Sequence, residues 1–444
     1  MQLRHVRCWL AVGSLSLCSV PAFANMGNLA TTYGVLPGDV ASAQALSLFN
    51  SSVSATYYNP AYLTHDPRGE LTLGLLHGEQ DLTAKSVSGN GYQVRDGDTL
   101  KSSPTQHVLI GMKTDLTSIT KYERPLYFGF MAGVEKYGAE MMAFNSNTSS
   151  QGQSLTYGRE PLFLNLGGGL EVVEGLSLGL SARITLQAEA KMRTNSTLGG
   201  TTDSEEIAVA AKPSIRPIAG LSADLGKLLC SGDCWASGFE VAMAYRAYSN
   251  TSTKIDANAI IPTVINDPGL FLRINTLDSY QPDILALGVQ YSGDRWRAGV
   301  TLEQQNWSDL GEELEKDTVK DQANLEFKDI IVPRIGGEFE LMDNIFLTGG
   351  VALVESPLKG NRSLDVNYFD NDKTIVGLGV AMEFQSPPVL AFPLRLDFGY
   401  QYQQLKDRDF ELTNTDPLNP SNPYETVTAG GEVNVFTGSL TVKF

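Results

Sequence analysis

The stretch that decides the fold is LSLGLSARITLQAEAKMR, residues 176–193, in which apolar and polar side chains alternate without a break. The even positions from Leu176 to Met192 are apolar, and the odd positions from Ser177 to Arg193 are small, polar or charged. Side chains of a β-strand point alternately to opposite faces, so the pattern predicts a strand with one apolar face. The segment exceeds the usual strand of about 3–10 residues, which favours a strand that crosses a bilayer and extends beyond it.

The same alternation recurs near residues 239–246, 296–303 and 394–403, with charged residues always opposite the apolar set. A barrel with lipid outside and a polar lumen inside requires this arrangement, although a β-sandwich shows the same alternation with the solvent on the other face. We predict fourteen strands, at residues 70–85, 105–116, 125–144, 155–173, 176–193, 204–229, 235–255, 280–292, 296–311, 328–342, 345–355, 373–385, 393–412 and 425–444.

The connections between these strands alternate in length. Short turns fall at residues 174–175, 293–295 and 343–344, and long loops at 256–279, 312–327, 356–372 and 413–424. Short turns on one side and long loops on the other are typical of bacterial outer-membrane barrels, whose short turns face the periplasm. The predicted fold class is therefore all-β: a fourteen-stranded antiparallel transmembrane barrel at residues 70–444. Phe444 closes its alternating last strand, in the way outer-membrane proteins present a terminal aromatic to the barrel-assembly machinery.

Residues 1–24 have the features of a signal peptide that is cleaved on export. Arg4 and Arg7 precede an apolar run, and Ala22-Phe23-Ala24 has the form of a signal-peptidase site. A lipoprotein cysteine at Cys18 is the alternative, which cleavage after Ala24 disfavours. No later segment has roughly 18 or more consecutive apolar residues, so we expect no membrane-spanning helix. The expected location is the outer membrane of a Gram-negative cell.

The charge balance and the cysteines exclude several functions. With 33 basic and 50 acidic residues and a net charge of -17, the chain would repel nucleic acid. Beyond the signal peptide, Cys230 and Cys234 remain in the sequence C-S-G-D-C, for which we predict a disulfide that closes a tight turn. The alternative is a redox or zinc site, but His65, His77 and His107 offer few ligands. We expect no metal and no cofactor.

Residues 25–69 do not show strand alternation. Leu46, Phe49, Tyr57, Tyr58 and Tyr62 are apolar without a strict period, and Gly, Asn and Pro punctuate the segment with turns. Exposing so many apolar side chains to water would be unfavourable. We therefore predict that it fills the barrel as a hatch, or plug, since an unplugged porin leaves an open channel.

The stretch A-T-Y-Y-N-P-A-Y-L, residues 55–63, stands before the fourteen predicted strands and resembles the hatch of the FadL/TodX family. These outer-membrane transporters carry long-chain fatty acids and aromatic hydrocarbons, and their hatch contains an N-P-A motif, matched here by Asn59, Pro60 and Ala61. The third predicted strand is also similar, with Y-G-A-E at residues 137–140 after Gly129 and Gly133. The resemblance extends over the mature chain in length, strand number and hatch position.

The resemblance implies passive uptake of a hydrophobic compound by lateral diffusion. Extracellular loops capture the compound, and it leaves sideways into the outer membrane through an opening at an inward kink of the third strand. Burial is worth about 0.8 kcal/mol per methylene, so a wall exit spares the compound an aqueous lumen. Gly129, Gly133 and Gly138 would permit the kink, and the alternative is that they are merely small residues within the barrel wall.

Two sets of residues are candidates for ligand binding. The loop at 256–279 is rich in apolar residues, which suits capture of a ligand, although a helical cap on the rim would use them too: Ile260, Ile261, Val264, Leu270 and Phe271. Inward-facing basic residues suit a carboxylate head group, as in the fatty-acid-binding members of the family, although lumen carboxylates would also pair with them: Arg183, Lys191, Arg193 and Arg246.

The expected partners are a long-chain fatty acid or another hydrophobic small molecule, outer-membrane lipid, and the barrel-assembly machinery during biogenesis. We expect a monomer and no nucleic acid. A general diffusion porin or structural barrel is the alternative function. An outer-membrane hydrolase is less favoured, since the sequence has no G-x-S-x-G and few histidines, so we do not expect an enzyme.

Overall fold

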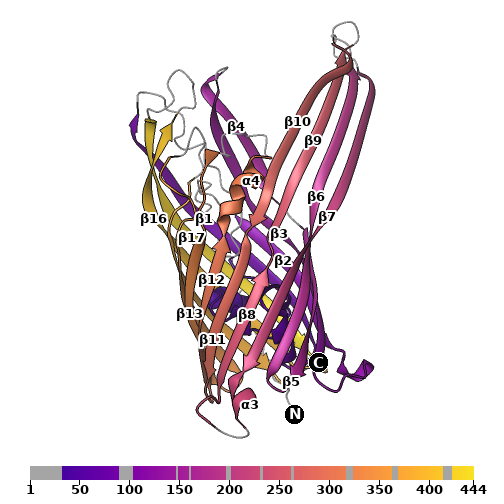
Figure 1. The fold of residues 1–444 in the computed structure, drawn as a ribbon, viewed down its shortest axis with the longest axis vertical. Coiled ribbons are helices and arrows are strands. Elements are labelled where there is room, and N and C mark those ends of the chain that lie inside the picture. Colours follow the sequence, from indigo (N-terminus) through magenta and orange to yellow (C-terminus); the bar gives the residue numbers. More distant parts are fainter. Residues whose placement is uncertain are drawn as a thin grey trace, which may run out of the picture.

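The computed structural model describes residues 33–89, 104–146, 149–159, 162–196, 202–230, 234–261, 265–316, 324–362, 369–413 and 423–444. Within these residues, seventeen strands form one sheet that closes into a barrel, with short helical segments inside it (Figure 1). Fourteen antiparallel strands form the barrel, as predicted, and three further strands, β4, β9 and β10, extend its wall. We call the end that holds residue 444 the lower end and the opposite end the upper end.

The elements in chain order are α1 (Pro37–Ala41), η1 (Ser47–Phe49), α2 (Ala55–Tyr58), η2 (Pro60–Thr64), β1 (Glu70–Gly89), β2 (Thr105–Asp115), η3 (Thr117–Ile119), β3 (Leu126–Ser146), β4 (Ser149–Arg159), β5 (Leu162–Val173), β6 (Leu176–Ser196), β7 (Thr202–Asp224), α3 (Leu225–Leu229), β8 (Phe239–Arg246), β9 (Ser249–Ile261), β10 (Ile265–Gln281), β11 (Asp283–Ser292), β12 (Trp296–Asn306), η4 (Trp307–Asp309), α4 (Leu310–Leu314), β13 (Ile330–Met342), β14 (Ile345–Val354), β15 (Lys373–Phe384), β16 (Leu394–Thr413) and β17 (Pro423–Lys443). None of the described helices is long and apolar enough to cross a membrane.

The first and last strands close the barrel. β1 pairs with β17 from Glu70 opposite Lys443 to Gly89 opposite Glu425. Below this ladder, the backbone N–H of Gly69 donates to the carbonyl of Phe444 at 2.7 Å, and the N–H of Phe444 donates back at 2.9 Å. The closure removes the open edges that a sheet of this size would otherwise expose to hydrocarbon.

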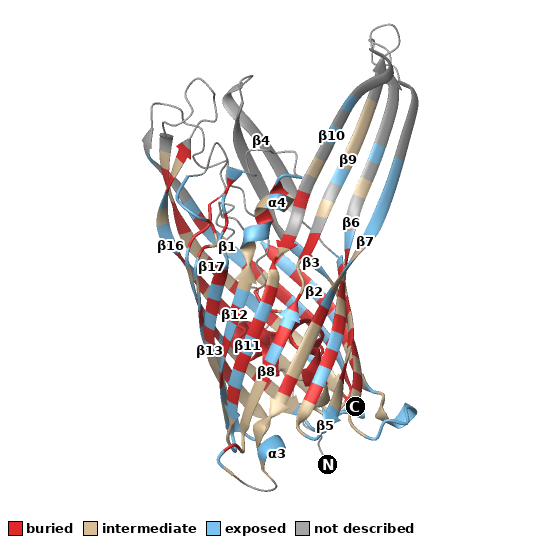
Figure 2. Ribbon diagram, in the orientation of Figure 1, coloured by how far each residue is buried: buried red, intermediate tan, exposed pale blue. Residues whose placement is uncertain are grey.

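The alternation of residues 176–193 has the predicted orientation wherever side chains are described. Figure 2 shows buried and exposed residues alternating along the barrel strands. On β6, Leu180 is 72% exposed on the outer face, whereas Ser181 and Arg183 are buried in the lumen. The apolar face is therefore the lipid-facing one, and charged residues lie inside.

Several predicted strand boundaries are wrong. The strand predicted at 155–173 is divided between β4 and β5, and the one at 204–229 ends at Asp224. There the Asp224 carboxylate accepts the backbone N–H of Lys227 at 3.2 Å and caps α3. The strand predicted at 296–311 ends at Asn306, and η4 and α4 follow it.

The largest difference concerns residues 249–281, where we expected the end of a strand and a loop. This segment is a hairpin of two strands, β9 and β10, that pair from Ile261 opposite Ile265 to Ser249 opposite Gln281. β9 also pairs in parallel with the upper part of β6, from Thr253 opposite Ala188 to Ile260 opposite Asn195. Of the apolar residues that suggested a capture loop, Ile260 and Ile261 belong to β9 and Leu270 and Phe271 to β10, and β6, which pairs with β9, is distant in sequence.

The plug, residues 33–69 of the described chain, lies inside the lower half of the barrel (Figure 1). Its helical segments are short, and nearly all of their side chains are buried. Pro37 and Pro60 each stand in the first turn of a helix, where the missing N–H of proline costs no hydrogen bond. The plug is therefore held by the barrel wall rather than by helix packing within itself.

The assignment of faces predicts that Leu180→Arg lowers the free energy of unfolding by about 2–4 kcal/mol in bilayers, because it places a charge on the lipid face near mid-membrane. Urea unfolding in phospholipid vesicles measures this difference. Gln304→Arg is the control, since Gln304 faces outward at the rim of β12, where such a charge costs only about 0–1 kcal/mol. Equal losses for both variants would contradict the assignment.

Candidate functional site

Asn59, Pro60 and Ala61 join α2 to η2 at the centre of the plug. The amide of Asn59 is fully buried; its oxygen accepts the backbone N–H of Ala61 at 3.2 Å, and its nitrogen donates to the carbonyl of Leu48 at 3.0 Å. The same nitrogen donates to the carbonyl of Leu221 on β7 at 3.3 Å. One side chain thus closes the turn, ties two plug segments together and attaches the plug to the barrel wall.

A row of three glycines on the wall receives this turn. Gly169, Gly179 and Gly220 stand directly opposite one another on β5, β6 and β7. A Cβ on Gly179 would lie 2.2 Å from the backbone nitrogen of Ala61, and one on Gly220 would lie 2.1 Å from the amide oxygen of Asn59. Any larger residue in this row would displace the plug.

The close fit continues around the lumen. Glycines on other strands also face the plug within a distance that a Cβ would fill, and these are Gly111, Gly129, Gly288, Gly336, Gly350, Gly377 and Gly399. Polar side chains between them hold plug carbonyls: Arg297 donates to Phe49 at 2.9 Å and Arg334 donates to Ala43 at 2.9 Å. The bond at Ala43 supports a turn with positive φ, 49° at Ala43, which is rare for a residue with a side chain.

The three glycines predicted to permit a kink have different surroundings. Gly129 faces the plug, where a Cβ would lie 2.8 Å from Thr56. Gly133 is enclosed by the wall itself, with Val108 and Phe163 as its neighbours. Gly138 lies within β3 where the pairing with β4 shifts register, between Tyr137 and Glu140, and its surroundings are outside the described residues.

The wall changes partners at this level. β3 pairs with β5 only as far as Val134 opposite Leu162, and above that it pairs with β4. β6 pairs with β5 only as far as Thr185 opposite Phe163, and from Ala188 it pairs with β9. The start of β5 therefore separates two diverging parts of the wall, next to Gly133.

Buried charges lie against the plug. Glu303 accepts from Arg246 at 2.6 Å and from Arg334 at 3.0 Å, so three lumen strands are joined by one carboxylate. Arg183 donates to Glu135 at 2.9 Å. Each charge is paired, as burial in a low-dielectric interior requires.

The plug supplies aromatic rings to these arginines. The guanidinium carbons of Arg183 and Arg246 lie 5.3 Å and 5.2 Å from the ring centre of Tyr57. Tyr57 is therefore held between two cations contributed by β6 and β8, which is a favourable cation–π arrangement.

Of the predicted ligand-binding residues, only Arg183 and Arg246 are brought together, beside Tyr57. Arg183 is in the buried pair with Glu135, and Lys191 is exposed on the upper part of β6. Phe271 is 65% exposed on β10. Ile260, Ile261 and Leu270 belong to β9 and β10, with side chains outside the described residues, as is the side chain of Arg193, and Val264 is outside them altogether.

An apolar cluster above the plug was not predicted. It is formed in the upper lumen by buried side chains from Tyr33 and Val40 of the plug and from β1, β10, β16, β17, α4 and the segments between strands, among them Leu82, Leu277, Tyr280, Leu310, Leu314, Phe369, Leu405, Phe410 and Leu412. Trp307 packs against it, 6.1 Å from Tyr280 between ring centres. Leu310 and Leu314, one helical turn apart, are a helical signal, but the predicted strand at 296–311 includes Leu310 and the predicted loop at 312–327 includes Leu314.

The lower end of the plug is fixed by ion pairs. Asp66 accepts from Arg68 at 3.0 Å and from Lys443 of the last strand at 3.1 Å, and Arg68 also donates to Glu383 at 2.6 Å. Burial favours the neutral form of the Asp66 carboxyl, but the hydrogen bonds from Arg68 and the charge of Lys443 outweigh it, so its pKa is well below the ordinary value.

A polar cavity of about 120 Å³ lies nearby, between the plug and the strands opposite the glycine row.

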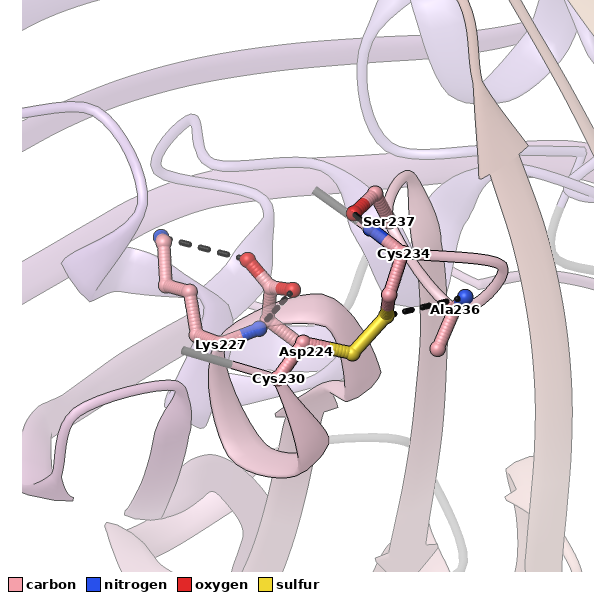
Figure 3. The surroundings of a disulfide bond; sticks show 6 residues. All are labelled: Asp224, Lys227, Cys230, Cys234, Ala236 and Ser237. Atoms are coloured by element: carbon pink, nitrogen blue, oxygen red, sulfur yellow. Dashed lines mark hydrogen bonds and ion pairs between the residues drawn. A yellow bond between two sulfur atoms is a disulfide. The ribbon is translucent and has the colours of Figure 1, made fainter. Parts of the chain in front are cut away.

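A disulfide joins Cys230 to Cys234 in the turn between β7 and β8, also at the lower end (Figure 3). Lys227 pairs with Asp224 at 3.2 Å beside it, and the backbone N–H of Ala236 donates to the sulfur of Cys234 at 3.3 Å. These contacts hold the turn compact.

Three comparisons with known proteins agree. A family described as outer membrane protein transport protein (OMPP1/FadL/TodX) matches residues 275–444. Alkane uptake protein A of Marinobacter nauticus is 51% identical over the whole of this chain and 97% of its own. Two crystal structures share the fold. A Pseudomonas aeruginosa FadL homologue has a TM-score of 0.62 and 15% sequence identity, over 95% of this chain and 99% of that one. The P. putida toluene transporter TodX has a TM-score of 0.53 and 12% sequence identity, over 93% of this chain and 99% of that one.

The glycine row predicts that Gly179→Ala displaces the N-P-A turn and opens the lumen to ions, since a Cβ there overlaps backbone atoms that cannot move separately from the plug. Single-channel conductance in planar bilayers should rise above the wild-type level. Gly438→Ala is the control, because a Cβ at that wall glycine meets its nearest atom at an ordinary 3.7 Å. Identical conductance for both variants would rule out a close fit between the plug and the glycine row.

The ion pairs predict a pH-dependent role for Asp66. Because its folded pKa is depressed, the stability that it contributes is present at neutral pH and is lost as the pH falls below about 4, the ordinary aspartate range. Asp66→Asn should therefore lower the thermal midpoint at pH 7, and its difference from wild type should shrink on acidification. Asp343→Asn, at a carboxylate that is 95% exposed, is the control, and an effect of equal size there would argue against this role.

Proposed function

The chain belongs to the OMPP1/FadL/TodX family of outer-membrane transport proteins, and from this premise we propose that it takes up hydrophobic compounds, with alkanes as the first substrate class to test. It is a transport protein of the outer membrane rather than an enzyme. Its lower end, where the short turns lie, faces the periplasm, and its upper end faces the medium. Alkanes come first because the relative that matches over the whole chain is an alkane uptake protein.

The apolar cluster in the upper lumen is the observation that carries this proposal. A porin that passes ions and sugars has a polar, water-filled interior. Here, aromatic and aliphatic side chains such as Phe369, Phe410 and Leu412 are buried inside the barrel on the extracellular side of the plug. A hydrocarbon that enters from the medium meets apolar surroundings there, and this favours its transfer from water.

The lower lumen would not carry the same compound further. Below the cluster stand the paired charges of Glu303, Arg246 and Arg334, and the plug fits closely against the wall glycines. An alkane passing there would lose its apolar contacts and would strip charges of their partners. This supports exit sideways through the wall rather than through the plug into the periplasm.

The change of strand partners at the start of β5 is the best-supported position for that exit. Gly133 lies at this level, and Gly138 lies where β3 shifts register against β4. In this proposal residues 25–69 are the plug and residues 70–444 the barrel, and residues 1–24 are the signal peptide removed on export. Asn59, Pro60 and Ala61 keep the plug seated below the exit. The barrel-assembly machinery would insert the chain, and outer-membrane lipid would receive the compound.

The direct test is uptake of radiolabelled n-hexadecane, and in parallel a long-chain fatty acid, by cells that lack their own transporters. Wild-type protein should restore uptake of hexadecane. Asn59→Ala should reduce it by about tenfold at equal surface expression, because the variant loses three hydrogen bonds, including the one to Leu221 of the wall, which costs the seated plug about 1–3 kcal/mol of stability. Gln304→Ala, on the outer rim, should leave uptake unchanged.

Two results would contradict the proposal. Folded wild-type protein that transports neither compound would exclude uptake of these substrates. Large, steady ion currents through the wild-type protein in planar bilayers would instead favour a diffusion porin. Uptake of the fatty acid alone would keep the transporter and change its substrate class, since the buried arginines would then have to release their carboxylates to bind a head group.

A further inference from the structure

The upper part of the wall includes a four-stranded sheet that rises above the rest of the barrel. It consists of the upper halves of β6 and β7 together with β9 and β10, in the order β7, β6, β9, β10 (Figure 1). One row across it joins Val209 to Ala190, Ala190 to Ile255, and Ile255 to Ile274. All four residues in this row are apolar.

The two faces of this sheet differ in polarity. On the face that continues the lipid-facing wall, the described side chains are aliphatic or proline: Leu186, Ile215, Pro213, Ala211, Val209, Ile255 and Ala257. On the face that continues the lumen they are mostly charged or polar, and two ion pairs lie there, Lys212 with Glu189 at 2.8 Å and Arg273 with Asp256 at 2.6 Å. Val209 is 76% exposed, and the ribbon of β7 is pale blue well above the barrel body (Figure 2).

The apolar exterior extends much further here than elsewhere. On β6 the outward positions are apolar from Leu176 to Met192, roughly 50 Å of strand at about 3.3 Å per residue. On β12 they are apolar only from Trp296 to Leu302, roughly 20 Å, before Gln304. Even at a tilt of about 45°, the β6 run stands roughly 35 Å tall, against the apolar band of about 25 Å that a barrel presents to a bilayer.

We propose that the outward face of the β7–β6–β9–β10 sheet is a contact surface for hydrocarbon outside the cell, which gathers the substrate above the outer leaflet and passes it down to the membrane and the barrel. The proposal rests on the proposed function and names the surface where capture begins. It replaces the loop that the sequence suggested. On β6 and β7 the apolar face joins the lipid-facing wall with no polar position between them, whereas on β9 and β10 Thr253 and Thr276 stand below Ile255 and Ile274. The natural occupant of the continuous β6–β7 part is of the same chemistry as the lipid chains below.

The composition of the face disfavours a second copy of the protein as its occupant. Protein interfaces concentrate their binding energy in tryptophan, tyrosine and arginine, and the described residues of this face are alanine, valine, isoleucine, leucine and proline. The free edge of β7 above β8 is also poorly suited to pairing with another strand. It carries Pro213 and Pro217, which lack the N–H that an added strand would need.

The first experiment uses neighbouring residues of one strand as matched variants. Val209→Glu and Ala211→Glu place a charge on the apolar face, and Ala208→Glu and Ala210→Glu place the same charge on the other face; all four positions are exposed. Uptake of emulsified n-hexadecane at limiting concentration should fall several-fold in the first pair and stay at the wild-type level in the second. Equal uptake in all four variants would overturn the proposal.

Failure of the proposed function looks different, since wild-type protein itself would then transport no hexadecane. Folding is checked in each variant by surface expression and by heat-dependent migration of the barrel. The direct contact is measured independently, with a fluorophore on Val209→Cys of the purified protein in nanodiscs. Quenching by brominated hexadecane droplets, and not by brominated phospholipid, is expected. Quenching by the phospholipid alone, or a stable dimer abolished by Val209→Glu, would overturn the proposal.

Discussion

The structure depends on one constraint, which is that no backbone N–H or C=O group can remain unpaired in hydrocarbon. A single sheet satisfies it only by closing, and β1 pairs with β17 along its whole length to do so. Closing fourteen strands leaves a hollow interior, which is itself unfavourable for a transporter of apolar compounds because water and ions would fill it. The plug and its close fit against wall glycines follow from that second requirement.

A mostly apolar plug inside a polar lumen leaves polar groups on both sides that need hydrogen-bond partners. The lumen positions alternate with lipid-facing ones, so they carry charges and small residues, whereas the plug has many backbone carbonyls and few regular hydrogen bonds of its own. The structure resolves this by direct pairing: Arg297 and Arg334 donate to plug carbonyls, and Asn59 donates to the wall at Leu221. Where contact is closest, glycine allows the two backbones to meet.

The upper half obeys a different requirement, since beyond the membrane the wall no longer has to be closed. There β3 and β6 leave β5 for new partners, and β9 joins β6 in parallel, an exception in an otherwise antiparallel barrel. The same freedom allows apolar side chains to gather inside the mouth and an apolar face to extend outside it. Uptake of a hydrophobic compound needs apolar surroundings above the plug, and the proposed exit through the wall lies at the same level, where the strands change partners.

The sequence alone determined the architecture, because the period of two along residues 176–193 and its repeats fix which face meets lipid, and lipid permits few solutions. It also indicated the plug and the turn at Asn59, since an apolar segment without strand alternation must be buried. The sequence did not determine the glycine row at Gly169, Gly179 and Gly220, the charge network around Glu303 or the sheet built from β6 and β9. Each of these joins residues far apart in the chain, and alternation within one strand carries no information about the register between strands, which the tertiary structure alone decided.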